Sequence, residues 1–104
     1  MSHSLVYITC DDMPEAQRIA AALIEERLAA CANMIEGMTS CYRWQGEIRS
    51  DREVVLIAKT KTALVPDLTD RVVALHSYDL PCVVAVAIDG GNPQFLEWIS
   101  EETK

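Results

Sequence analysis

A chain of 104 residues, half of them hydrophobic, can form one domain with a modest core and is too apolar to be disordered. Its net charge of −7 argues against a nucleic-acid partner, because binding phosphates needs a basic face. No apolar run is long enough for a transmembrane helix. We therefore expect a single domain over residues 1–104, without contact to a membrane. The surplus carboxylates either attract cations or simply keep the protein soluble.

The N-terminus predicts a cytoplasmic location, because residues 1–4 lack the basic and apolar regions of a signal peptide. The thiols Cys10, Cys31, Cys41 and Cys82 are then expected to be reduced. No C-x-x-C pair is present, which argues against a zinc knuckle or a thioredoxin-like motif.

The first predicted elements are a strand and a helix. Leu5–Thr9 is short and β-prone. Asp12 is a plausible helix N-cap, with Pro14 in the first turn and Glu15 three residues after the cap. Apolar residues then recur at helical spacing, which predicts a helix that ends near Ala29.

A long hairpin is predicted next. Asn33–Tyr42 and Glu53–Thr60 are both β-prone, and Gln45-Gly46 between them is a good turn. Gly37 interrupts the first of these strands and marks a bulge or a bend.

The second half predicts helix, strand and helix. Thr62 can cap a helix whose apolar stripe ends at Leu75. A loop follows, then the strand Cys82–Ile88 and a short helix over 93–102 with Asn92 as its cap.

The order β-α-β-β-α-β plus a C-terminal helix indicates an α+β, ferredoxin-like fold with an antiparallel sheet. In this topology the first strand lies between the third and the fourth, and both helices cover one face. The strands are nevertheless apolar on both sides, so the open face needs a cover. A partner subunit is one solution, and the tail helix folded over the open face is the alternative.

Five motifs resemble the CutA divalent-cation-tolerance family. In chain order they are E-R-L-A-A-C-A-N (26–33), Y-R-W-Q-G-E-I (42–48), L-I-A-K-T (56–60), L-H-S-Y-D-L-P (75–81) and G-N-P-Q-F-L-E-W (91–98). The resemblance implies a tight homotrimer, whose fold is similar to that of the PII signalling proteins. It also implies binding or tolerance of copper and other divalent cations.

The topology suggests where a metal could bind. The end of the first strand lies near the start of the fourth, which brings Cys10 toward Cys82 and toward His76. Thiolate and imidazole are ligands that suit copper. The alternatives are that the cysteines pack as small hydrophobes and that His76 caps a helix end. Some family members carry a second histidine where this chain has Leu75.

Trp44, Lys59 and Tyr78 form a second candidate site, since all three lie in the matched motifs. A cleft between subunits holding them could bind a small anion or metabolite. Alternatively, Trp44 packs between subunits and Lys59 pairs with a carboxylate.

No catalytic motif is present, which argues against an enzyme. The sequence thus predicts a trimeric, copper-binding protein of cation tolerance. A small-molecule sensor resembling PII proteins and a structural trimer that organises partner proteins are the alternatives.

Overall fold

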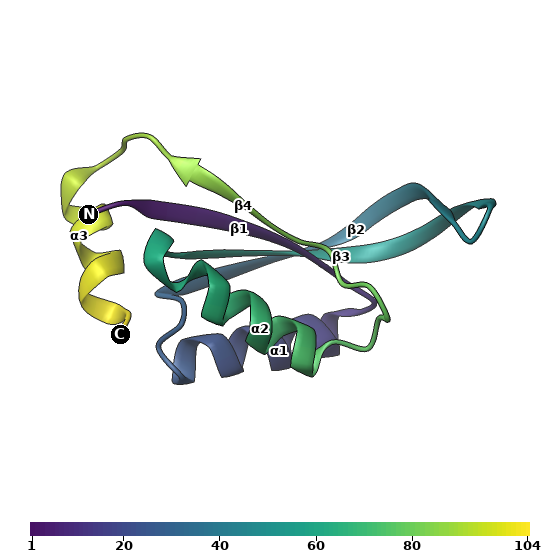
Figure 1. The fold of residues 1–104 in the computed structure, drawn as a ribbon, viewed down its shortest axis with the longest axis horizontal. Coiled ribbons are helices and arrows are strands. Elements are labelled where there is room, and N and C mark those ends of the chain that lie inside the picture. The colour runs from purple at the N-terminus through teal and green to yellow at the C-terminus, as the bar shows by residue number, and fades with distance from the viewer.

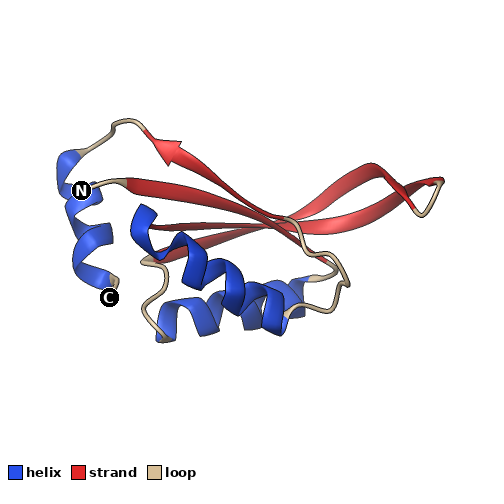
Figure 2. Ribbon diagram, in the orientation of Figure 1, coloured by secondary structure: helices blue, strands red, loops and turns tan.

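The structure of this chain is a computed structural model that describes residues 1–104. It confirms the predicted order of elements (Figure 2). These elements are β1 (His3–Cys10), α1 (Met13–Glu25), β2 (Cys31–Trp44), β3 (Glu47–Lys61), a 3-10 turn (Thr62–Leu64), α2 (Val65–Leu75), β4 (Val83–Ile88) and α3 (Pro93–Glu102).

The four strands form one sheet in the order β2-β3-β1-β4, and every neighbouring pair is antiparallel. Both α1 and α2 lie against one face of this sheet, and α3 lies at the end where the two chain termini meet (Figure 1). The α+β, ferredoxin-like arrangement predicted from the sequence is therefore confirmed, including the central position of β1.

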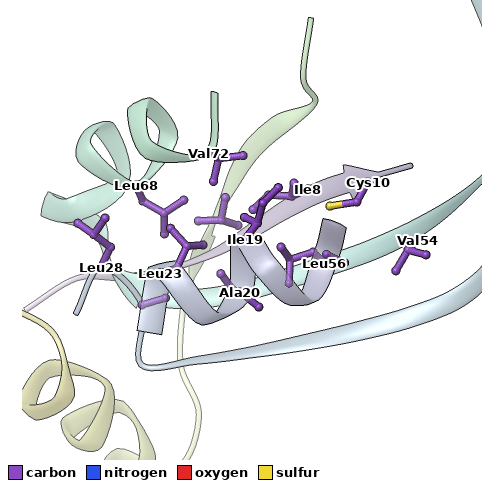
Figure 3. Packing of buried hydrophobic residues seen from close by; sticks show 14 residues of the cluster. Ile8, Cys10, Ile19, Ala20, Leu23, Leu28, Val54, Leu56, Leu68 and Val72 are labelled. Atoms are coloured by element: carbon purple, nitrogen blue, oxygen red, sulfur yellow. The ribbon is translucent and has the colours of Figure 1, made fainter. Parts of the chain in front are cut away.

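The hydrophobic core lies between the sheet and the two helices (Figure 3). Alternate residues of β1 and β3 point into it, because successive side chains of a strand face opposite sides. The fully or nearly fully buried members of the cluster include Val6, Ile8, Cys10, Ile19, Leu23, Leu56, Leu68 and Val72.

Helix α1 begins as predicted but ends earlier. The Asp12 carboxylate caps it by accepting the backbone N–H of Glu15 at 2.9 Å. The helix ends at Glu25 rather than near Ala29, because Arg27 takes the left-handed conformation with φ of 58°. The backbone N–H of Leu28 then bonds back to the carbonyl of Leu23 at 2.9 Å, which closes the helix end.

The β2–β3 hairpin is longer than predicted, and its tip extends beyond the body of the molecule (Figure 1). The predicted irregularity at Gly37 is confirmed, since the register shifts between Ile35 and Met38 and Gly37 has φ of +88°. The predicted turn is also confirmed. Both Gln45 and Gly46 have positive φ, at 50° and 81°, as a tight two-residue hairpin turn requires.

One predicted cap in the second half is wrong. Thr62 does not cap α2, which begins three residues later without a side-chain cap. Its hydroxyl instead lies 2.8 Å from that of Ser4 and joins β1 to the turn after β3. Strand β4 begins at Val83, one residue later than expected, and Asn92 caps α3 as predicted by accepting the N–H of Gln94 at 3.0 Å.

The tail helix does not cover the open face of the sheet. Helix α3 is held at the start of β1, where His3 Nε2 lies 2.7 Å from the Ser100 hydroxyl. Ile35, Val84 and Val86 on the open face stay 54%, 52% and 58% exposed. The alternative in which α3 supplies the missing cover is therefore wrong.

Candidate functional site

Three potential ligand groups converge where β1, α1 and α2 meet. One donor atom from each of Cys10, Glu15 and His76 lies within 4.8 Å of the other two. Cys10 ends β1, Glu15 stands in the first turn of α1, and His76 follows the last turn of α2. The expected approach of Cys10 to His76 is thus present. Sequence reasoning noticed Glu15 only as a capping residue, and that position was the available signal for a third group.

The His76 ring is fully buried and uses both of its nitrogens. Nε2 lies 2.8 Å from the carbonyl oxygen of Thr9. Because a carbonyl can only accept, Nε2 carries the proton. Nδ1 accepts the backbone N–H of Tyr78 at 3.1 Å. His76 is therefore held as one neutral tautomer that ties the 76–78 segment to the end of β1.

The Glu15 carboxylate is also engaged. Oε1 accepts the backbone N–H of Asp11 at 3.0 Å, and Oε2 accepts that of Ser77 at 2.9 Å. Burial by itself would raise the pKa of this carboxyl. The hydrogen bonds from Asp11 and Ser77 outweigh that effect and lower the pKa below its ordinary value. Glu15 is thus an ionised group beside the Cys10 thiol.

Cys10 is a protonated thiol in this environment. Its side chain points into the core (Figure 3) and is fully buried. Burial first, and then the negative charges of Glu15 and Glu53, raise the pKa of the thiol from 9.0 to about 12. Cys10 must lose this proton before it can act as a thiolate ligand.

The donor types at this cluster fit a borderline or soft cation, since sulfur and imidazole suit copper and zinc. The hydrogen bonding adds a condition. A metal ion at Nδ1 of His76 would compete with the Tyr78 N–H for the same lone pair. Loading the cluster therefore requires the 76–78 segment to move and the Cys10 proton to leave.

Cys82 does not join this cluster. The ladder pairs Val83 with Ile8, so Val83 shares the helix-covered face with Ile8 and Cys10. Cys82 precedes Val83 and falls on the opposite side of the sheet, because side-chain direction alternates. The topology therefore brings the backbone of Cys82 near the end of β1, as expected, but its thiol lines a different cavity and does not join Cys10.

That cavity is a cleft of about 570 Å³, which we call the hairpin cleft. It lies between the β2–β3 hairpin and the loop before β4. Its lining includes the aromatic side chains Tyr7, Tyr42, Trp44 and Tyr78 and the charged residues Arg43, Arg49, Glu53 and Asp79.

A partly buried hydrogen bond joins two residues that line the hairpin cleft. The Tyr78 hydroxyl donates to Glu53 Oε2 at 2.8 Å, and Glu53 is only 9% exposed. Burial, followed by the bond and charge of Glu53, raises the pKa of Tyr78 far above its ordinary value. Tyr78 therefore remains a neutral donor at physiological pH.

The structure places two of the three predicted cleft residues together. Trp44 and Tyr78 both line the hairpin cleft. Lys59 is not among the lining residues, and its ammonium group instead lies 2.7 Å from the side-chain oxygen of Asn33. It forms no pair with Glu47 or Glu53, since Glu47 faces Arg49 and Glu53 accepts from Tyr78.

Comparison with known proteins gives a consistent picture. Residues 4–102 match the family model described as CutA1 divalent ion tolerance protein. A relative from Thermus thermophilus, named divalent-cation tolerance protein CutA, is 50% identical over 95% of this chain and 96% of its own length. Protein CutA from Mus musculus is 42% identical over 99% of this chain, which spans only 58% of that longer protein.

Solved structures agree with these sequence matches. The crystal structure of CutA1 from Oryza sativa superposes with a TM-score of 0.97 at 40% identity, over 100% of this chain and 95% of that one.

No helix of the present chain combines the length and the apolar character needed to cross a membrane.

Proposed function

This chain belongs to the CutA1 divalent ion tolerance protein family, and from that membership we propose that it acts in divalent-cation tolerance by binding the cation, with copper preferred. The observation that carries the proposal is the convergence of Cys10, Glu15 and His76 within 4.8 Å. Cys10 and His76 are the proposed ligands, and Glu15 supplies a neighbouring negative charge. The net charge of −7 favours the approach of cations.

We propose that the working form is a homotrimer. The open face of the sheet supports this, because Ile35, Val84 and Val86 are more than half exposed and no element of the chain covers them. The expected cytoplasmic location and the absence of catalysis stay predictions.

Copper and zinc titrations of the reduced protein by calorimetry test the metal proposal. We expect the double variant Cys10→Ser, His76→Ala to bind copper about tenfold or more weakly, since both proposed ligands are gone. Cys41→Ser is the matched control, because Cys41 is exposed and lies outside the cluster. Unchanged affinity in a folded double variant would remove this site.

The hydrogen bond at Nδ1 of His76 offers a second readout. If copper binds Nδ1, the Tyr78 N–H loses its acceptor. Its amide hydrogen exchange should then speed up on loading with copper or with the diamagnetic substitute zinc. Unaltered protection of Tyr78 in a fully loaded protein would place the metal elsewhere.

The hairpin cleft supports a second candidate function, the binding of a small anion or metabolite. An aromatic cleft with two arginines and a buried carboxylate has the mixed lining of small-molecule sites. A thermal-shift screen tests it, since a ligand at 100 times its Kd adds about 2.7 kcal/mol to the stability. A hit whose shift disappears in Trp44→Ala but persists in Lys59→Ala would assign the cleft. A broad panel without hits would count against it.

A further inference from the structure

Cys31 and Lys59 form a cysteine–lysine contact that neither the metal proposal nor the hairpin cleft uses. The two residues are direct partners in the β2–β3 ladder, so their side chains lie on the same, open face. The Lys59 nitrogen lies 3.7 Å from the Cys31 sulfur. We propose that this pair is an oxidant-responsive modification site, at which dioxygen joins the two side chains through one bridging oxygen atom.

The surroundings hold the lysine nitrogen in place. The Asn33 side-chain oxygen accepts a hydrogen bond from Lys59 Nζ at 2.7 Å, on the same face and two residues from Cys31. The neighbouring backbone is also hydrogen-bonded, because the N–H of Ala30, the residue before Cys31, donates to the carbonyl of Lys59 at 2.9 Å. Hydrogen bonds thus hold both the backbone and the side-chain nitrogen of Lys59 beside Cys31.

The other cysteines lack this arrangement. Cys10 is fully buried, and the pKa of its thiol is raised to about 12, which leaves it inert. Cys41 and Cys82 have no lysine or arginine in hydrogen-bond contact with their sulfur atoms, whereas Cys31 has Lys59. Cys31 is half-buried within its own chain, and dioxygen is small enough to enter where the proposed trimer would cover this face.

The chemistry balances with dioxygen as the only co-reactant. The ammonium group first gives a proton to solvent. The S–H bond and one N–H bond then break, and one oxygen atom forms bonds to both sulfur and nitrogen. The second oxygen atom leaves as water with the two hydrogens. Sulfur and nitrogen each lose two electrons, and dioxygen takes up all four. The bridge removes the positive charge of Lys59 and its bond to Asn33.

Peptide mass mapping tests the bridge. The full-length protein is held in air-saturated buffer with a metal chelator, so that the result does not depend on the proposed metal function. We expect one crosslinked peptide pair that contains Cys31 and Lys59 and is heavier than its two parts by one oxygen less two hydrogens. Trypsin should fail to cleave after Lys59, and a thiol reductant should restore both the cleavage and the original masses.

The chain supplies its own controls. Lys61 and Lys104 are the only other lysines, and the three remaining cysteines are alternative crosslinking partners within the same chain. Lys59→Arg keeps the positive charge but should abolish the crosslink, as should Cys31→Ser. The proposal is overturned if Cys31 is found only as sulfenic or sulfinic acid with Lys59 unmodified. It is equally overturned if bridges spread over other lysines and cysteines, because no specific contact would then direct them.

Discussion

At the scale of single residues, two tyrosines show how burial changes the value of the same bond. The Tyr78 hydroxyl donates to Glu53, which is 9% exposed. The Tyr42 hydroxyl donates to Asp51 on the exposed hairpin arm. Removal of a donor from a buried carboxylate leaves it unsatisfied, whereas water replaces the donor at an exposed one. The two sites form a matched pair for measurement.

We predict that Tyr78→Phe lowers the free energy of unfolding by about 1–3 kcal/mol and that Tyr42→Phe changes it by less than about 0.5 kcal/mol. Denaturant unfolding of the reduced, metal-free protein checks both values. Equal losses in the two variants would show that Glu53 is not isolated from water as the structure indicates.

The pKa shift of Tyr78 adds a pH dependence. The pKa in the folded protein is raised above the ordinary value of 10.0. A raised folded pKa contributes stability that is fully present below the unfolded pKa and is lost as the pH rises through the folded one. The stability difference between wild type and Tyr78→Phe should therefore stay constant from neutral pH to just below 10.0. A difference that already shrinks near neutral pH would contradict this assignment.

At the scale of elements, the bulge in β2 decides how the hairpin continues. Before it, Ile35 pairs with Val55, and after it, Met38 pairs with Glu53. The extra residue on β2 bends the strand and changes the direction of its second part, which carries Trp44. Gly37 absorbs the bend with φ of +88°, a conformation that residues with a Cβ atom adopt only with strain.

We predict that Gly37→Ala destabilises the protein by about 1–2 kcal/mol through the backbone alone. A Cβ atom at this position would meet nothing within 4 Å, so steric contact contributes nothing. Gly90→Ala is the control, because Gly90 also has open space but no positive φ. Thermal unfolding compares them, and equal melting temperatures for the two variants would remove the argument from strain.

At the scale of the whole molecule, helices cover one face of the sheet and leave the other face uncovered. Helices α1 and α2 bury the first, whereas the second keeps Val84 and Val86 more than half exposed at the edge strand β4 (Figure 1). An exposed apolar edge strand is also a template for pairing with another chain. The proposed trimer would both cover the exposed apolar face and pair the edge strand β4.

We predict that Val86→Glu dissociates the assembly and that Val73→Glu does not. The two valines are similarly exposed, at 58% and 50%, but Val73 lies on α2, on the helix-covered side. Light scattering after gel filtration should give three times 11.6 kDa for wild type and Val73→Glu and a lower mass for Val86→Glu. A wild-type mass equal to one chain would overturn the proposed homotrimer.

The sequence by itself determined the order of the elements and the topology of the sheet. Local signals were sufficient for this, because the Asp12 and Asn92 caps, the Gln45-Gly46 turn and the irregularity at Gly37 all act within a few residues. Where local signals were ambiguous, the prediction was wrong. Thr62 could cap a helix, but a contact with Ser4, distant in sequence, took its hydroxyl instead.

Only the tertiary structure decided what surrounds each candidate residue. The approach of Cys10 to His76 followed from strand order, but the tautomer of His76, the third group Glu15 and the raised pKa of the Cys10 thiol depend on burial and on bonds between distant segments. Motifs suggested Trp44, Lys59 and Tyr78 as one site, and the structure separated Lys59 from the cleft and set it beside Cys31. The physical reason is that a sequence encodes periodicity and caps locally, whereas distances, desolvation and hydrogen-bond partners arise only when the chain closes on itself.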